Sequence, residues 1–393
     1  AQRLPAAAPG GFRLLTVPDP AAGRSPVRDL LKDPAFLRLW AAGGLTNSMR
    51  WVEMLVSGLF AYELTGSAFA VSLVLMSRAL PMLTAGALSG AVAESLDRKK
   101  LLMAGQAATA AGAIVVSLLA ATGATVWQAR GTPWLWPAML AHGVVLIFLF
   151  APLHETIHRT AFATRSANEA VAFLLGCLIL LPREYFRAFH FPHPRLSQDP
   201  VYDPEPPRPK PATLPQYPWV VSGIPYWIGQ ARLVATQALG RTPERFYKDD
   251  RQRRAVVREA RLMLAIYAAV AAASLAAGSP AALLLWVVPA LLGQPFLRMY
   301  LLAEHTLCPL VPDMLENTRT TYTNGLVRFL AWNMPFHAEH HAYPSVPFHA
   351  LPRVNALIRD RLKVTAPGYT AGQRQITESR GRRAEDQPLS RLP

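Results

Sequence analysis

The sequence predicts an all-α membrane protein with about six transmembrane helices and one further helix at the membrane interface. Of the 393 residues, 51% are hydrophobic and only 17% are charged, against about 25% charged in an ordinary soluble domain. Six apolar segments reach the length of about 20 residues that spans a bilayer. They lie at approximately 41–63, 68–91, 101–122, 133–152, 260–279 and 281–303. The formal charge of +15 lies mainly between these runs, which fits flanks of membrane spans better than a nucleic-acid partner.

Charge in the links predicts how the spans are oriented. Basic residues precede the first span at Arg24, Arg28, Lys32 and Arg38, and three more lie in the link 97–100. Because basic loops stay in the cytoplasm, we expect the N-terminus, and the segments after the fourth and sixth spans, on the cytoplasmic side. A seventh apolar run, 170–182, is only about 20 Å long as a helix. We expect it to lie in the interface or to enter and leave on one side.

Histidines gather in the segments expected on that side. Seven of the ten form three groups: His154 and His158 in HETIH, His190 and His193 in HFPH, and His337, His340 and His341 in HAEHH. An eighth, His305, ends the sixth span. Residues three or four apart share a helical face, so the first and third groups each direct their imidazoles to one side. Such ligands suit Fe, Zn, Cu or Ni, and their number predicts a site for two metal ions.

Other interpretations of these residues stay open. HETIH also matches the zinc-protease pattern H-E-x-x-H, in which Glu155 would be the general base. A zinc hydrolase needs only three protein ligands and one open position, so this pattern leaves most of the clustered histidines unexplained. The two cysteines, Cys177 and Cys308, exclude a disulfide framework and a four-cysteine metal site.

From about 134 to 363, the chain resembles the membrane fatty acid desaturase and hydroxylase superfamily. Its first histidine box matches His154 and His158, and its third box, His-x-x-His-His, matches the histidines of NMPFHAEHHAYPSVPFHALP. The resemblance implies a bundle of membrane helices whose cytoplasmic histidine boxes bind two irons. It assigns eight metal ligands: His154, His158, His190, His193, His305, His337, His340 and His341.

One box departs from the family pattern. The second box gives His190 and His193, but Pro194 stands where a third histidine belongs, and proline has no side chain that binds metal. This substitution predicts an incomplete coordination sphere, and loss of activity is one possible consequence. Around the metals, candidate partners that would orient the imidazoles are Asp313, Asn317, Arg319 and Asn333.

The front of the chain resembles a different family. Residues 34–122 are similar to the first three helices of a major facilitator drug-efflux transporter, through DPAFLRLW, ELTGSAFAVSLVL and GAVAESLDRKKLL. Such a transporter has twelve spans in two halves with the substrate site between them. Three spans cannot form that pathway, so this segment is interpreted as a transporter-derived remnant that supplies helices.

These observations predict four regions: a disordered tail at 1–33, a transporter-like three-helix segment at 34–125, a desaturase-like domain at 126–365, and a disordered basic tail at 366–393. The predicted function is that of a fatty acyl desaturase or hydroxylase, in which O2 at two Fe ions oxidises the C–H bonds of a fatty acyl group. Membrane lipid or an acyl thioester would be the substrate, and a separate ferredoxin- or cytochrome-type protein would supply two electrons. The expected location is the bacterial inner membrane. The alternatives are a membrane zinc metalloprotease and a non-catalytic, transporter-derived fusion or fragment.

Overall fold

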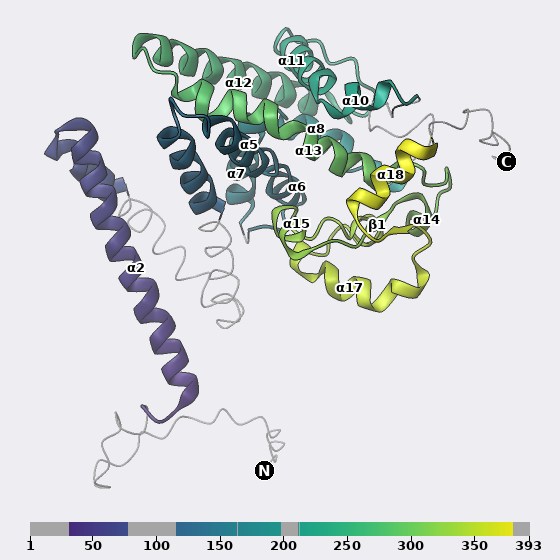
Figure 1. Ribbon diagram of the computed structural model, residues 1–393, viewed down its shortest axis with the longest axis horizontal. Helices are drawn as coiled ribbons and strands as arrows, with labels where there is room; N and C mark the ends of the chain where they lie inside the picture. Colours follow the sequence, from purple (N-terminus) through teal and green to yellow (C-terminus); the bar gives the residue numbers. More distant parts are fainter. Residues whose placement is uncertain (1–30, 78–114, 163, 198–210, 212, 380–393) are drawn as a thin grey trace, which may run out of the picture. The chain divides into compact units, whose positions relative to one another are not determined.

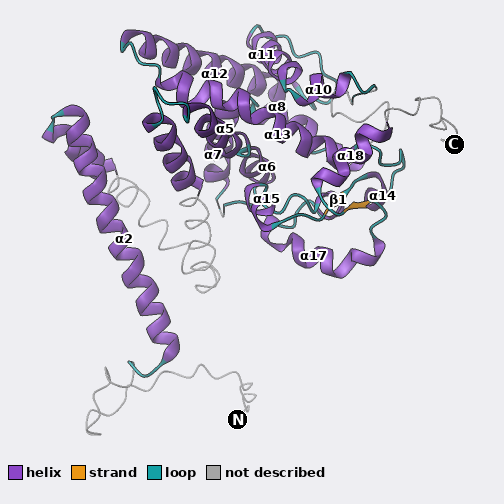
Figure 2. Ribbon diagram, viewed as in Figure 1, coloured by secondary structure: helices purple, strands orange, loops and turns teal. Residues whose placement is uncertain are grey.

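Almost all regular structure in the described residues is helical (Figures 1 and 2). The structure is a computed structural model that describes residues 31–77, 115–162, 164–197, 211 and 213–379. The chain divides into two compact units, Ala1–Leu101 and Leu102–Pro393, and each is treated by itself. The all-helical prediction is therefore confirmed for the described residues, apart from one pair of two-residue strands.

In the first unit, the main element is α2 (Pro34–Thr65). Asp33 caps its start by accepting a hydrogen bond from the Ala35 amide, and Pro34 occupies the first helical position, where no donor is needed. The helix ends at Gly66, whose φ of 63° is the left-handed conformation that favours glycine. A short apolar helix, Ala68–Ser77, follows.

The second unit begins its described part with an apolar helix, Val115–Gln128, and continues through two pairs of helices. These are α5 (Leu135–Ile147), α6 (Phe150–His158), α7 (Arg165–Ile179) and α8 (Arg183–His190). Thr164 caps α7 by accepting from the Ala167 amide. The short α9 (His193–Leu196) and α10 (Gln216–Val221) lead to α11 (Ile224–Ala238).

A long helical hairpin follows. It consists of α12 (Asp250–Ala276), the π-helix η1 (Leu283–Val287) and α13 (Val288–His305). α5 and α13 cross at two glycines. A Cβ at Gly143 would collide with the Pro289 carbonyl, and one at Gly293 with the Gly143 carbonyl. Small residues allow this close approach of two apolar helices, which fixes the helix that ends at His305 against the one that leads to His154.

The C-terminal part packs short elements around the end of α13. They are α14 (Met314–Asn317), β1 (Thr320–Thr321), α15 (Gly325–Leu330), α16 (His337–Ala342), η2 (Phe348–Ala350), α17 (Leu351–Ile358), η3 (Arg359–Arg361), β2 (Thr365–Ala366) and α18 (Tyr369–Ser379). β1 and β2 pair in parallel, with Thr320 opposite Thr365. An antiparallel bridge from Thr320 to Phe336 brings the start of α16 to the same place.

Three helical stretches in the described residues are long and apolar enough to cross a membrane. They are α5 with α6 (Leu135–His158), α12 (Asp250–Ala276) and η1 with α13 (Leu283–His305). They correspond to the fourth, fifth and sixth predicted spans. The first predicted span is helical within α2 but does not belong to this set, since Arg50, Glu53 and Glu63 interrupt its apolar sequence. Much of the second and third, together with the link 97–100, lies outside the described residues. The first ten residues of the short run 170–182 lie in α7, a helix of 15 residues that ends at Ile179.

The predicted C-terminal tail is partly wrong. Residues expected to be disordered from 366 onward instead form the end of β2 and all of α18. Ile376 is fully buried, and the Gln373 amide donates to the Met299 carbonyl of α13 at 2.6 Å. Figure 1 shows α18 lying along α13. The mostly polar sequence of α18 gives no sign of these two anchoring side chains; residues 380–393, like 1–30, lie outside the described part.

Candidate metal centre

The three histidine groups and His305 come together from five helices of the second unit. His154 and His158 lie on α6, His190 ends α8, His193 begins α9, His305 ends α13, and α16 carries His337, His340 and His341. Seven of the eight are less than 9% exposed, and His158 is half-buried. The sequence therefore identified side chains that the fold does bring together.

Four of them form one cluster: His154, His158, His190 and His340. The Nε2 atom of His190 is 2.9 Å from the Nε2 atoms of both His154 and His158. The His340 ring centroid lies 4.6 Å from that of His154 and 4.9 Å from that of His158. We call this set cluster A.

The others form a second cluster around the end of α13. It contains His193, His305 and His341, each of which has one candidate ligand nitrogen within 4.8 Å of those of the other two. The Nε2 atoms of His193 and His305 are 3.3 Å apart. His337 adjoins them, with its Nε2 atom 3.2 Å from that of His305. We call these four residues cluster B.

Local structure explains why neighbouring histidines separate. Successive helical residues point about 100° apart, so His340 on α16 turns toward cluster A while His341 turns toward cluster B. The third group, for which the spacing predicts one shared helical face, therefore contributes to both clusters. The second group divides as well. Phe191 and Pro192 separate the end of α8 from the start of α9, so His190 and His193 belong to different clusters.

The geometry of the clusters is better explained by bound metal ions than by histidines that are buried and hydrogen-bonded to one another. Two ligand nitrogens about 2.1 Å from one ion and at right angles lie about 3 Å apart, close to the separations within cluster A. Neither ring nitrogen of His340, which is 1% exposed, has a hydrogen-bond partner among the described residues. Buried polar atoms are nearly always paired, so these nitrogens suit a bound cation.

The electrostatics also favour metal ligation. Burial, and after it the neighbouring imidazoles, hold the pKa values of His190, His340 and His341 well below the usual value of 6.5. The rings are therefore neutral at pH 7. Neutral imidazole is the form that binds metal, so no proton needs to leave these side chains when a cation enters.

Cluster B has polar neighbours that the sequence did not indicate. The Ser197 hydroxyl lies 3.3 Å from His193 Nε2 and 3.3 Å from His341 Nδ1, and the Thr318 hydroxyl lies 3.4 Å from the same Nδ1. A carboxylate oxygen of Glu304 is 3.4 Å from His337 Nδ1. No spacing rule could find Ser197 or Thr318, because only the fold brings them to these rings.

The four candidate orienting residues have different positions. The backbone carbonyl of Asn317 lies 3.5 Å from His305 Nδ1. Its side-chain amide donates to the backbone carbonyls of Ser197 and Val311. The buried Arg319 donates to the Ala303 and Thr306 carbonyls on either side of His305. Asp313 instead caps α14, and Asn333 accepts from Arg328. The first two contact His305 or the carbonyls beside it, whereas Asp313 bonds to the backbone of α14 and Asn333 makes a half-buried contact with Arg328.

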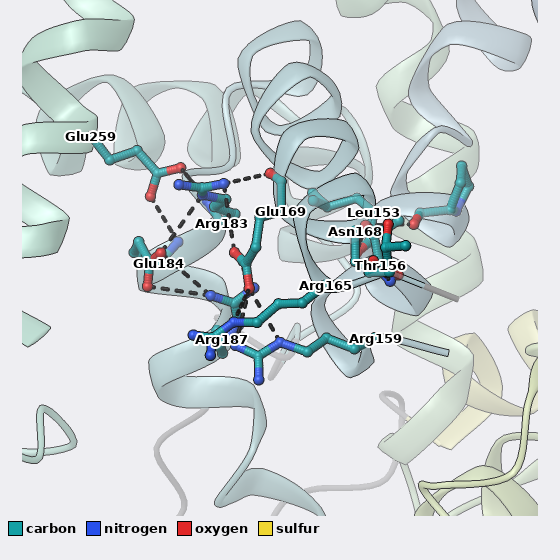
Figure 3. A network of polar contacts seen from close by, with 12 residues as sticks. Leu153, Thr156, Arg159, Arg165, Asn168, Glu169, Arg183, Glu184, Arg187 and Glu259 are labelled. Carbon is teal, nitrogen blue, oxygen red and sulfur yellow. Dashed lines mark hydrogen bonds and ion pairs between the residues drawn. The ribbon is translucent and has the colours of Figure 1, made fainter. Parts of the chain in front are cut away.

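A carboxylate at the centre of four arginines ties together the helices of cluster A (Figure 3). Glu169 on α7 accepts from Arg159, which directly follows His158, at 3.0 Å and from Arg187, three residues before His190, at 2.9 Å. Arg183 and Arg165 lie within 4 Å of the same carboxylate. Burial disfavours its ionisation, but the guanidinium groups outweigh burial and lower the pKa of Glu169.

Glu155, the acidic residue of HETIH, is hydrogen-bonded to the backbone beyond α16 and belongs to neither cluster. A Glu155 carboxylate oxygen accepts from the Phe348 amide at 3.0 Å, and Glu155 is 1% exposed. It therefore holds the chain that follows α16. A general base must reach a water on the metal, which this contact does not favour.

Comparison with known families agrees with the resemblances seen in the sequence. A model of the fatty acid desaturase family matches residues 131–373, more than half of the chain, and includes every histidine of both clusters. A model of the transmembrane secretion effectors, a major facilitator group, matches residues 25–135. A search of curated proteins gave no match. The chain belongs to the fatty acid desaturase family and has a transporter-like region at its front.

Proposed function

We propose that the protein is a membrane-bound di-iron enzyme that oxidises an unactivated C–H bond of a fatty acyl group. The observation that carries this proposal is the pair of adjoining, buried histidine clusters within the desaturase match. In desaturation, –CH2–CH2– plus O2, two electrons and two protons gives –CH=CH– and two waters. In hydroxylation, C–H plus the same reactants gives C–OH and one water.

The metal ligands we propose are the eight histidines of the two clusters. His154, His158, His190 and His340 would hold one iron, and His193, His305, His337 and His341 the other. Imidazole ligands also suit zinc and copper; family membership favours iron. When bound, the two irons would supply the activation of O2.

The protein's own contribution is to orient the acyl group and to exclude water. A cavity of about 30 Å³ lies against both clusters, and apart from Glu304 its other walls are apolar: Phe150, Phe186, Phe189, Leu301 and Met334. Apolar walls favour a methylene over water. Holding one methylene beside the metal site selects which carbon reacts, and the boxes alone do not distinguish desaturation from hydroxylation.

Pro194 does not remove either cluster. It is buried at the start of α9, while His193 beside it reaches cluster B and His305 joins from α13. Four histidines thus remain available for each metal, with Ser197 beside them. This supports an active enzyme over a degenerate one. The Glu155 contact to Phe348 counts against the zinc protease.

We propose the following organisation for the full chain. Residues 34–125 form a transporter-derived helical segment, and 126–365 form the oxidase, to which α18 adds one more packed helix. The clusters would face the cytoplasm of a bacterial inner membrane, where a separate ferredoxin- or cytochrome-type protein delivers electrons. A membrane lipid or acyl thioester would be the substrate.

Expression of the full chain in a bacterium, followed by lipid analysis, tests this proposal. Wild type should give unsaturated or hydroxylated acyl groups that are absent when His341→Ala is expressed. His349 lies outside the clusters and is exposed, so His349→Ala should leave the products unchanged. Identical lipid profiles for wild type and His341→Ala, at equal protein levels, would contradict the proposal.

A further inference from the structure

An apolar cavity lies away from the two histidine clusters, between the two helices of the long hairpin. Its volume is about 470 Å³, within the range of about 300–1,000 Å³ that is common for small-molecule sites. α12 contributes Tyr267, Ala271 and Leu275, and η1 with the start of α13 contributes Leu283, Trp286 and Leu291. The end of α7 closes it with Cys177, Leu178 and Leu180.

The walls of this cavity leave few polar atoms for water. The Tyr267 hydroxyl donates to the Cys177 carbonyl at 2.8 Å, and the Trp286 Nε1 donates to the Leu178 carbonyl at 2.7 Å. Most other lining side chains are hydrocarbon. A water molecule needs two to four polar partners to remain in a cavity. The occupant that this lining favours is therefore a hydrocarbon.

The surroundings supply such an occupant. Two of the three helices that are long and apolar enough to cross a membrane form the walls. Leu275 and Leu283, at the rim, are 82% and 56% exposed. In the membrane placement proposed above, this rim meets the acyl tails of the bilayer. An unfilled groove there would forfeit van der Waals contacts along its whole lining.

The cavity is separate from the reaction site. Leu291 lies fourteen residues before His305 on α13, about 21 Å at 1.5 Å per residue, and the cavity shares no lining residue with the one against the clusters. A carbon held here cannot be the carbon that is oxidised.

We propose that this cavity binds one acyl tail of a membrane phospholipid that is not the substrate. The bound tail supports the end of α7, where Leu180 adopts a left-handed φ of 56° and Tyr226, Tyr267 and Trp286 donate to three carbonyls of α7. Two residues after Leu180, Pro182 directly precedes α8, the helix that ends at His190. The lipid site thereby stabilises the support of the second histidine box.

Photo-crosslinking tests the site on the full-length protein in nanodiscs of phosphatidylcholine that carries a diazirine at the end of one acyl tail. Peptides containing Leu178, Tyr267 or Trp286 should be labelled in the wild type. Ala271→Phe should abolish most of that labelling by filling the cavity. Ala272→Phe, on the same exposed part of α12 but outside the lining, should leave it unchanged.

A second filling variant from the opposite wall, Ala282→Phe, guards against a local folding defect at residue 271. Equal labelling in Ala271→Phe and Ala272→Phe, or no cavity labelling in the wild type, would overturn the proposal. Loss of labelling on adding stearoyl-coenzyme A would also overturn it, by identifying a substrate tail as the occupant. Metal content measured on the same samples reports separately on the di-iron proposal.

Discussion

The two histidine clusters adjoin each other and share α16, yet they are held in different ways. Cluster B has polar neighbours: the hydroxyls of Ser197 and Thr318, the Asn317 carbonyl and the Glu304 carboxylate. In cluster A, His154 Nδ1 and both nitrogens of His340 have no hydrogen-bond partner among the described residues. Its helices are instead tied from outside by Glu169 and its arginines (Figure 3).

This difference shows two solutions to one problem, which is to keep several neutral imidazoles aimed at one point. A hydrogen bond to the nitrogen that does not bind the metal orients an imidazole ring and raises its basicity. Because His305 and His341 have such partners at Nδ1, we expect cluster B to retain its metal longer against a chelator. Cluster A depends on the relative position of α6 and α8. It should therefore be the more sensitive to changes made outside the ligand set.

The largest effect should come from the adjacent pair His340 and His341. Because each belongs to a different cluster, His340→Ala and His341→Ala should each lower the iron content by about one ion per protein molecule. The double variant should lose nearly all of it. Iron quantified per molecule after purification tests this expectation. Loss of both ions in each single variant would mean that the clusters form one inseparable site.

The next largest effect should come from Glu169→Gln. Removing the charge releases Arg159 and Arg187, and altered support of metal ligands typically costs about 10–100-fold in affinity. Cluster A should lose metal to a chelator faster than cluster B does. Glu378→Gln, which removes an exposed pair with Arg374, is the matched control. If both variants retain metal like the wild type, the arginine network does not support cluster A.

The ionisation of Glu169 should make the stability of the folded protein depend on pH. Its pKa is lowered in the folded protein from the ordinary value of 4.5, so its stabilising contribution is complete above about pH 4.5 and is lost as the pH falls through the folded value. The difference in Tm between wild type and Glu169→Gln should therefore shrink as the pH is lowered from about 6 toward about 3. A difference that is constant over this range would show that ionised Glu169 does not stabilise the fold.

A smaller effect is expected for Ser197→Ala. This change removes one hydroxyl from His193 and His341, while Thr318 still contacts His341. Metal should leave cluster B several-fold faster, with the stoichiometry at saturation unchanged. Ser379→Ala, in α18, serves as the control. Identical release rates for the two variants would assign Ser197 to packing alone.

The smallest effect is expected for Glu155→Gln. The amide oxygen can still accept from the Phe348 amide, so iron content and lipid products should stay near wild type. A zinc protease would instead lose its general base and all of its activity. Abolished activity with retained metal would therefore favour the protease.

Much of the site follows from the sequence because its signals are local. The spacing of His154 and His158 predicts a shared helical face, and α6 provides it. The hydropathy of 260–303 predicts the helical hairpin that α12 and α13 form, and it places His305 at the end of a span. Regular helices translate short-range spacing into geometry, which is why these predictions hold.

What the sequence could not provide depends on contacts between distant segments. Ser197 meets His341 across 144 residues and Glu155 meets Phe348 across 193, and no local pattern encodes either contact. The division of α16 between two clusters depends on where α6 and α13 end relative to it. α18 was missed because its one buried apolar side chain, Ile376, stands among polar residues, and the Gln373 contact with α13 is visible only in the fold.

The central claim is that the two clusters hold two irons, and metal analysis of the full-length protein tests it most directly. The protein is purified in detergent from cells supplied with both iron and zinc, and each metal is counted per molecule. The account predicts about two irons and little zinc. One zinc without iron would contradict it in favour of the protease, and no metal at all would show that the clusters are empty remnants.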